Sequence, residues 1–389
     1  MRGIRIASAV MASWIVSQAA AAQEAETSRI SATDPRVGHI VRLLEGVGMS
    51  RPVFKSASVS GSSIFLEGFR AYGPHNLSTR AAFLEVVNLD RGQNEIAASS
   101  LVLKDAVLGS WDPNGYALEA KSISVVRPNA TTSTIRPRLR FDRIRFSDAI
   151  LRDGGRTLAR FETAAVEAAA WFVGREIPRS LRLSLQGNLV WSGGSQKPAD
   201  PGRSLKANGA YFIDEHGNGD LSISANVVDG GDYEISARFS GLNRPLFTSL
   251  REFEEATRDV TKSPSETYRS HGALEASFYG HLEKVQIVSV SAQMSSMEWL
   301  RDEIARRGRE VGRRPDAIAK DQAREITSVF RGWGSDAALA HLEAQLSNFF
   351  QSPSSIFLRG AHDDPIPFPT SKDERSKLLD RLGLVPTKS

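Results

Sequence analysis

The sequence contains no cysteine and no motif typical of a common catalytic or nucleotide-binding site. The absence of cysteine excludes disulfide bonds, thiol nucleophiles, cysteine metal sites and a lipid-modified cysteine behind an export signal. A P-loop, a dinucleotide-binding glycine fingerprint, a serine nucleophile elbow and an SxxK motif are also missing. The seven histidines are scattered, without the spacing of metal ligands. We therefore predict no cofactor, no metal and no enzymatic activity.

The chain carries only a small excess of positive charge. The chain has 49 Lys and Arg against 45 Asp and Glu, a net charge of +4. Removing Arg2 and Arg5 with an export signal leaves +2. This balance argues against a general nucleic-acid-binding protein, which would carry a strongly basic surface.

Apolar runs long enough to cross a membrane are missing as well. The longest, from about Ile6 to Val16, is shorter than the roughly 20 residues that a spanning helix needs. It follows Arg2 and Arg5 and precedes alanines at 19–22, an order typical of a secretory signal peptide. We predict a signal peptide over residues 1–22 and a periplasmic mature chain without a transmembrane segment. An uncleaved anchor or a buried first helix is the alternative.

The rest of the chain divides into three further regions that differ in their pattern of apolar and polar residues. Residues 23–52 combine a polar linker with a helix, for which Asp34 is the N-cap and Pro35 suits the first turn. In residues 53–245, apolar and polar residues alternate in short runs that are separated by turn residues, which predicts strands and hairpins. Residues 246–389 are helical with interspersed strands, and we expect them to pack on the same sheet.

Apolar spacing predicts the C-terminal helices in more detail. They cover residues 246–260, 297–312, 316–333 and 336–351, and a short final helix begins with a capping box of Ser371 and Glu374. Residues 272–293 have the pattern of a strand. The pattern of the alanine-rich segment 155–172 does not distinguish a helix from a strand. The fold class is α+β and mainly β: an elongated or curved antiparallel sheet with C-terminal helices packed on it.

One short motif recurs three times in the β region. The sequences FLEGF (65–69), LKDAV (103–107) and FSDAI (146–150) each read large apolar, any, acidic, small, apolar. Their first residues are 38 and 43 positions apart, which predicts repeated hairpin units of about 40 residues. Because alternate residues of a strand share a face, the acid would lie between two inward apolar side chains. We predict that the acidic and small residues form a bulge that turns the carboxylate to an edge or to solvent.

The apolar residues that flank these acids are candidates for a ligand-binding face. They form three pairs, and we expect both members of each pair to point inward: Phe65 and Phe69, Leu103 and Val107, and Phe146 and Ile150. The alternative is that the carboxylates themselves line a metal or catalytic site, although no histidine flanks them.

Two other clusters are candidate ion sites. Residues 214–220, DEHGNGD, followed by Asp229 and Asp232, have enough oxygen ligands for calcium, but they read better as an ordinary hairpin turn. Basic residues in IARRGREVGRR form a candidate patch for anionic lipid headgroups, namely Arg306, Arg309 and Arg313. A merely solvated helix face is the simpler interpretation of that patch.

Several stretches together resemble the AsmA-like and related uncharacterised periplasmic proteins of Gram-negative bacteria. They are VSGSSIFLEGFRAY, RAAFLEVVNLDRG, EIAASSLVLKDAVLG, ALEAKSISVVRP and QLSNFFQSPSSIFLRGAHDDPIPF, between Val53 and Phe368. The resemblance implies a long curved sheet with a hydrophobic concave face, and a role in envelope biogenesis and lipid handling. No catalytic residues belong to that pattern. The chain departs from it in having a cleavable-looking signal instead of an N-terminal membrane anchor.

Three functions follow, in order of preference. The first is a periplasmic module that binds lipid or another amphiphile on the inner sheet face, with peripheral membrane contact. The second is a structural protein whose apolar face is plain core and which acts through an envelope protein partner. The third is a hydrolase using dispersed carboxylates such as Asp105 and Asp148.

Overall fold

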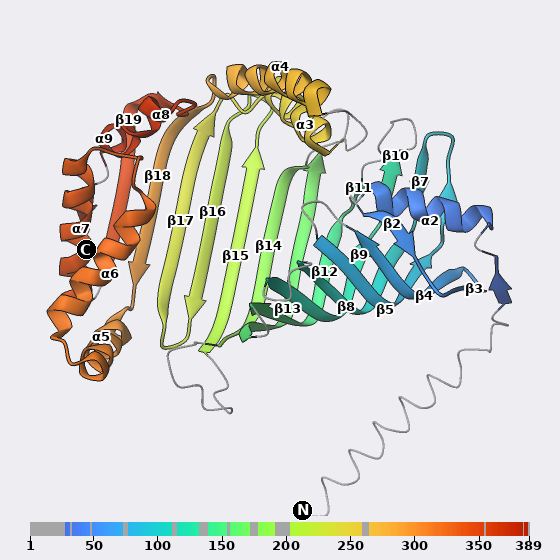
Figure 1. The fold of residues 1–389 in the computed structure, drawn as a ribbon, viewed down its shortest axis with the longest axis horizontal. Helices are drawn as coiled ribbons and strands as arrows, with labels where there is room; N and C mark the ends of the chain where they lie inside the picture. Colours follow the sequence, from blue (N-terminus) through green and yellow to red (C-terminus); the bar gives the residue numbers. More distant parts are fainter. Residues whose placement is uncertain are drawn as a thin grey trace, which may run out of the picture. The chain divides into compact units, whose positions relative to one another are not determined.

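The computed structural model comprises two compact units, which are described separately (Figure 1). Unit 1 contains residues 1–112 and 120–141, and unit 2 contains residues 113–119 and 142–389. The structure describes residues 28–31, 33–46, 49–72, 77–110, 115–131, 139–153, 156–171, 178–190, 203–258, 264–353, 355–383 and 385–387. The predicted signal peptide lies outside these residues.

Unit 1 is a sheet packed against one helix and a second, small sheet. Its main sheet has the strand order β1-β3-β4-β5-β8-β9, with β2 paired to β4, and the small sheet has the order β11-β10-β7-β6. The elements are β1 Ser28–Ile30, α2 Pro35–Gly46, β2 Ser50–Val53, β3 Ser56–Ser60, β4 Ser63–Tyr72, β5 Leu77–Val87, β6 Asp90–Arg91, β7 Glu95–Ala97, β8 Ser100–Ser110, β9 Tyr116–Val126, β10 Asn129–Thr131 and β11 Leu139–Arg140.

Helix α2 confirms the prediction for its segment. The Asp34 carboxylate accepts the backbone N–H of Arg36 at 2.9 Å, and Pro35 is the first helical residue. Its apolar stripe is fully buried, with Ile40, Leu43 and Leu44 at 0% exposure. The apolar face of the main sheet is equally closed, with Leu66, Phe69 and Leu84 at 0% exposure, and the core of unit 1 is therefore filled.

Unit 2 is a broad antiparallel sheet in which each strand pairs with the next one along the chain, from β12 to β20 (Figure 1). Its strands are β12 Arg143–Asp153, β13 Arg156–Trp171, β14 Pro178–Leu189, β15 Arg203–Ile213, β16 Gly219–Val227, β17 Gly231–Ser240, β18 Gln286–Ser295, β19 Ile356–Pro367 and β20 Val385–Thr387. The mainly β fold with consecutive antiparallel hairpins is thus as predicted, and the alanine-rich segment left open by the sequence is strand β13.

The helices of unit 2 follow β17 and alternate with the last strands. They are α3 Arg244–Arg258, α4 Pro264–Leu282, α5 Glu298–Val311, α6 Pro315–Val329, α7 Asp336–Gln351, α8 Lys372–Arg375 and α9 Leu378–Leu382. The capping box of Ser371 and Glu374 is present. The strand-like prediction for residues 272–293 is wrong in its first half, because α4 continues to Leu282 and β18 begins only at Gln286. Within the described residues, the structure has no helix both long and apolar enough to cross a membrane.

The recurring acidic motif marks a crease in three strands. Each copy contains one residue with positive φ: the acidic residues Asp105 in β8 and Asp148 in β12, each at 48°, and in β4 the small residue Gly68, at 63°, which follows the acidic Glu67. The carboxylates of Glu67, Asp105 and Asp148 are all exposed, as predicted for a bulge. A left-handed residue rotates the chain and shifts the alternation of side chains by one position.

This shift corrects the predicted pairing of apolar residues. In β4 the buried face is carried by Leu66 and then Phe69, three positions on, so Phe65 points to the other face. In β8 it passes from Leu103 to Ala106, and Val107 lies on the opposite face.

The same step of three occurs in β12. The register with β13 places Phe146 and Ala149 on one face and Ile150 on the other. The expectation that both apolar residues of each motif point inward is therefore wrong, because it assumed an uninterrupted period of two.

The positive φ at Asp148 predicts that the effect of a β-branched side chain on the free energy of unfolding depends on its position in β12. Asp148→Val forces a branched residue into the left-handed region and should lower the free energy of unfolding by about 1–2 kcal/mol. Ser147→Val, one position earlier on ordinary strand backbone, should leave it nearly unchanged, and Asp148→Gly should be tolerated. Urea unfolding followed by circular dichroism measures all three. Equal losses for the two valine variants would contradict the assignment.

Candidate functional site: an open apolar face on unit 2

The register of unit 2 aligns apolar side chains in rows that run across the strands. Cross-strand partners share a face of a sheet, so the rows are read directly from the pairing. The middle row consists of Ile144, Val166, Leu183, Gly209, Ile223 and Ile235. The rows on either side are Phe146, Ala164, Leu185, Ala207, Ala225 and Tyr233, and Ala168, Leu181, Tyr211, Leu221 and Ala237. We call these residues the apolar face.

The other side of the same strands is polar. One row across it consists of Arg145, Ala165, Ser184, Asn208, Ser224 and Glu234. Two shallow hollows of about 270 and 410 Å³ lie over this side and share Asn208 and Ser224 in their lining. This division into an apolar and a polar side is usual for an antiparallel sheet that packs with one side only.

Helices cover the apolar face at the C-terminal end of the sheet. Met294 of β18 and Ile356 of β19 continue its rows, and they pack in one buried cluster with α5, α6 and α7 (Figure 1). A second cluster joins α9 to Ile287 and Ile366. The predicted packing of C-terminal helices on the sheet is therefore seen on β18 and β19.

The apolar face remains open on strands β14 to β17. Leu183, Ile223 and Ile235, which lie in one row, are 43%, 43% and 46% exposed. Large aliphatic side chains with this exposure on three different strands form a contiguous apolar surface rather than scattered exceptions. The face is thus core at one end and open surface at the other.

The two tyrosines of this face offer no free hydroxyl. Tyr211 donates to the carbonyl oxygen of Pro178 at 2.6 Å, and Tyr233 donates to that of Gly230 at 2.9 Å. Burial raises the pKa of Tyr211 to about 12 and that of Tyr233 above its usual value. Both rings therefore stay neutral and contribute only apolar surface.

The region around Gly230 also fixes α5 against the sheet. The indole N–H of Trp299, in α5, donates to the Gly230 carbonyl at 2.7 Å, and the Arg203 guanidinium lies 4.8 Å from the Trp299 ring centre. Gly231 has φ of 98°, and a side chain there would collide with the Met297 sulfur. The covered part of the face is thus held by specific contacts next to the open part.

The predicted ligand-face residues are separated by this arrangement. Phe69 and Leu103 belong to the closed core of unit 1, whereas Phe146 lies on the apolar face of unit 2. The sequence missed Leu183, Ile223 and Ile235, although each lies in a run of alternating apolar and polar residues, RLSLQ, LSISA and DYEISA. That alternation is the sequence signal for the apolar face.

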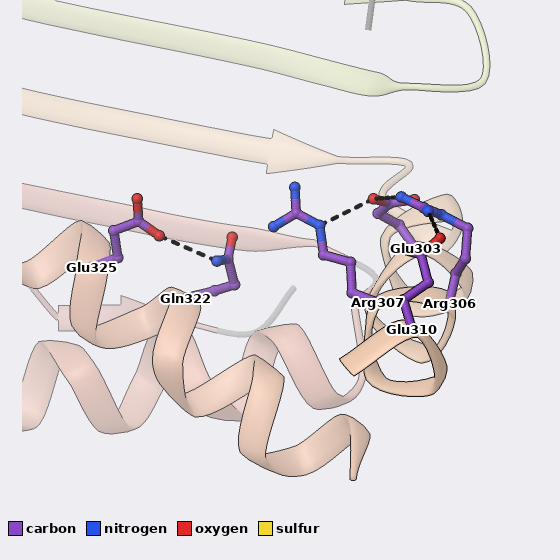
Figure 2. A network of polar contacts seen from close by, with 6 residues as sticks. All are labelled: Glu303, Arg306, Arg307, Glu310, Gln322 and Glu325. Carbon is purple, nitrogen blue, oxygen red and sulfur yellow. Dashed lines mark hydrogen bonds and ion pairs between the residues drawn. The ribbon is translucent and has the colours of Figure 1, made fainter. Parts of the chain in front are cut away.

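The predicted headgroup patch on α5 is largely neutralised. Arg306 pairs with Glu303 at 2.6 Å and also with Glu310 (Figure 2). Arg313, just after the end of α5, pairs with Asp321 at 2.5 Å. Hydrogen bonds from Arg306 hold the pKa of Glu303 below its usual range. Only Arg309 of the three remains exposed without an ion pair in the described part of the chain. This arrangement favours the simpler interpretation, a solvated helix face.

The candidate calcium loop is a hairpin turn closed by its own aspartate. The Asp214 carboxylate accepts the backbone N–H groups of His216 and Asn218 and the Asn218 side chain, each at 2.8 Å. These hydrogen bonds lower the pKa of Asp214. No group of three or more acidic or histidine side chains in the described residues is arranged to hold a metal ion.

Comparison with known proteins adds one match. A family model described as an uncharacterised protein matches residues 224–387, the part of unit 2 from β16 to β20. No curated protein and no solved structure matches the chain. The resemblance to AsmA-like proteins therefore stays a prediction.

Two glycines of unit 2 should respond oppositely to substitution. A Cβ on Gly209, in the middle row, would meet its nearest neighbour, Leu183, at an ordinary 3.5 Å, whereas one on Gly187 would lie 2.1 Å from the Arg160 carbonyl. Gly209→Val should preserve the free energy of unfolding or raise it by up to about 1 kcal/mol. Gly187→Ala should lower it by about 2–3 kcal/mol through overpacking. Chemical denaturation provides both values, and a destabilised Gly209→Val protein would contradict an open face.

Proposed function

We propose that this protein is an exported, non-enzymatic module that binds the hydrocarbon part of a lipid or another amphiphile on the open apolar face of unit 2. The observation that carries the proposal is the row of Leu183, Ile223 and Ile235, which spans strands β14 to β17 and has side chains that are 43–46% exposed. Covering such a surface releases about 25 cal/mol per Å² of apolar area.

The chemistry of the face supports hydrocarbon as its occupant rather than a protein segment. A bound peptide would bring backbone N–H and C=O groups that need partners, since leaving them buried and unpaired is costly. The three rows supply only aliphatic, aromatic, alanine and glycine residues, and both tyrosine hydroxyls already donate to backbone carbonyls. An acyl chain needs no hydrogen-bond partner.

The shape of the middle row supports the same choice. Gly209 lies between Leu183 and Ile223, so the surface is lowest where a side chain is missing. Neighbouring strands are about 4.8 Å apart, which makes the row from β14 to β17 long enough for several methylene groups. Each methylene that leaves water contributes about 0.8 kcal/mol.

A pair of polar substitutions tests the proposal. Ile223→Asn with Ile235→Asn should weaken binding of a dansyl-labelled fatty acid at least about tenfold, because the amides must be desolvated by the chain. The matched control is Ser222→Asn with Ser224→Asn, which changes the two neighbours of Ile223 on the polar side. Fluorescence titration gives the affinities, oleate serves as the competitor, and thermal melting checks the fold.

Native mass spectrometry of the purified wild-type protein completes the test. We expect co-purified lipid in the wild-type and control proteins and little in the isoleucine variant. Equal affinities for both variants, together with a lipid-free wild-type protein, would overturn the proposal and favour the alternative of a protein that acts through a partner.

A further inference from the structure

A second apolar surface lies at the end of α6 and in the turn that follows it. Ile326, Val329, Phe330 and Trp333 are exposed by 38%, 74%, 37% and 38%. The first three are spaced so that they share one side of a helix. Backbone hydrogen bonds from Phe330 to Thr327 and from Trp333 to Phe330, at 3.0 and 2.9 Å, continue the turn and hold Trp333 beside them. We call these four residues the α6 patch.

The α6 patch lies at the C-terminal end of α6, outside the part of the helix that packs in the core. The buried residues of α6 are Ile318, Ala319, Ala323 and Thr327, which face the cluster shared with α7. After Thr327 the large apolar side chains continue, but each is at least 37% exposed. Apolar residues gathered at an exposed turn are typical of an interaction site.

The turn is firmly attached to α9. The N–H of Leu379 donates to the carbonyl of Trp333 at 2.8 Å, and the Asp380 carboxylate accepts both the backbone N–H and the hydroxyl of Ser335, at 2.7 and 2.6 Å. A side chain on Gly334 would collide with Leu379. The patch therefore has a defined position in the fold.

Unpaired basic side chains border the patch. Arg331 lies within the turn, and Lys377 and Arg381 flank the α9 residues that contact it. All three are exposed, and no carboxylate in the described residues forms an ion pair with them. Asp380, which lies between Lys377 and Arg381, accepts two hydrogen bonds from Ser335. This differs from α5, where arginines are paired with glutamates.

We propose that the α6 patch docks this protein on a lipid bilayer that contains anionic lipids. Trp and Phe favour the boundary between headgroups and acyl chains, and Lys and Arg beside them attract lipid phosphates. The proposal rests on the proposed function and extends it by naming the surface that meets the membrane. Since α6 and α9 pack on the apolar face at β18 and β19, docking would hold the open part of that face on the same side of the sheet as the bilayer.

The size of the patch argues against a second copy or another protein as its occupant. A stable protein interface involves about 20–30 residues on each side, whereas the patch has four apolar and three basic residues. A bilayer needs no matching shape. A few inserted side chains with nearby positive charge are enough for reversible attachment.

Vesicle flotation tests the docking surface. We expect wild-type protein to float with phosphatidylcholine vesicles that contain phosphatidylglycerol, and to remain in solution with phosphatidylcholine alone. Val329→Asn with Trp333→Ser should reduce the bound fraction at least about tenfold. The matched control, Val311→Asn with Tyr279→Ser, removes two exposed apolar side chains elsewhere in unit 2 and should bind like wild type.

Charge reversal provides a second arm that leaves packing intact. Arg331→Glu with Lys377→Glu should weaken binding about thirtyfold, whereas Arg309→Glu with Arg301→Glu on α5 should have little effect. If thermal melting shows that the apolar variant does not fold, the charge-reversal variants alone test the docking proposal.

Three outcomes would overturn the proposal: equal flotation of patch and control variants, equal flotation with and without phosphatidylglycerol, or a patch-dependent dimer in light scattering without vesicle binding. Fatty-acid titration of the patch variants separates the two proposals. Retained fatty-acid affinity with lost flotation assigns the defect to docking alone, whereas loss of both would point to damage at the open apolar face.

Discussion

The alternation of side chains along a strand is the constraint on which this structure depends. A strand presents successive residues to opposite faces, so a sheet with one apolar face must keep the same parity over its whole length. In β4, β8 and β12 that parity changes once, at Gly68, Asp105 and Asp148, where φ is positive. The left-handed residue moves the apolar pattern from one set of alternate residues to the other without changing which side of the sheet is apolar.

The acidic residues of the motif follow from this geometry. Aspartate tolerates the left-handed region better than most residues with a side chain, and an exposed carboxylate at the crease meets no desolvation cost. The small residue beside it then begins the new apolar phase, as Ala106 does in β8 and Ala149 in β12. In β4 glycine itself takes the left-handed position and Glu67 precedes it. The motif thus encodes a bend in the chain and needs no catalytic role.

The sequence predicted much of the fold because its signals were local. Alternation, turn residues and capping residues such as Asp34 and Ser371 act over a few positions, and the corresponding elements are present. The strand prediction is wrong for the N-terminal half of residues 272–293 because its apolar residues fit a strand nearly as well as a helix. The motif itself predicts a bulge, but it does not reveal that the left-handed residue shifts the alternation by one position, which changes the face of every later side chain.

The candidate site was harder to predict for a different reason. Whether an apolar residue is core or open surface depends on what covers it, and cover comes from distant parts of the chain. Phe69 in unit 1 and Leu183 in unit 2 look alike in sequence, yet the first has 0% exposure and the second 43%. Cover from other elements distinguishes them: Phe69 is enclosed in the core of unit 1, whereas α5, α6, α7 and α9 of unit 2 pack at β18 and β19.

The extent of helical cover links the two surfaces of unit 2. Helices α5 to α7 and α9 close the apolar face at β18 and β19, and the contacts of Trp299 and Tyr233 with Gly230 hold this cover at β17. Fully burying one Leu or Ile contributes about 1.5–3 kcal/mol, so leaving three nearly half exposed forgoes about 3 kcal/mol in total. A ligand that covers the row recovers this free energy, which folding alone leaves unused. The same helices that end the cover also carry the α6 patch, so the boundary between closed and open face and the proposed contact with the bilayer are set by one group of packed elements.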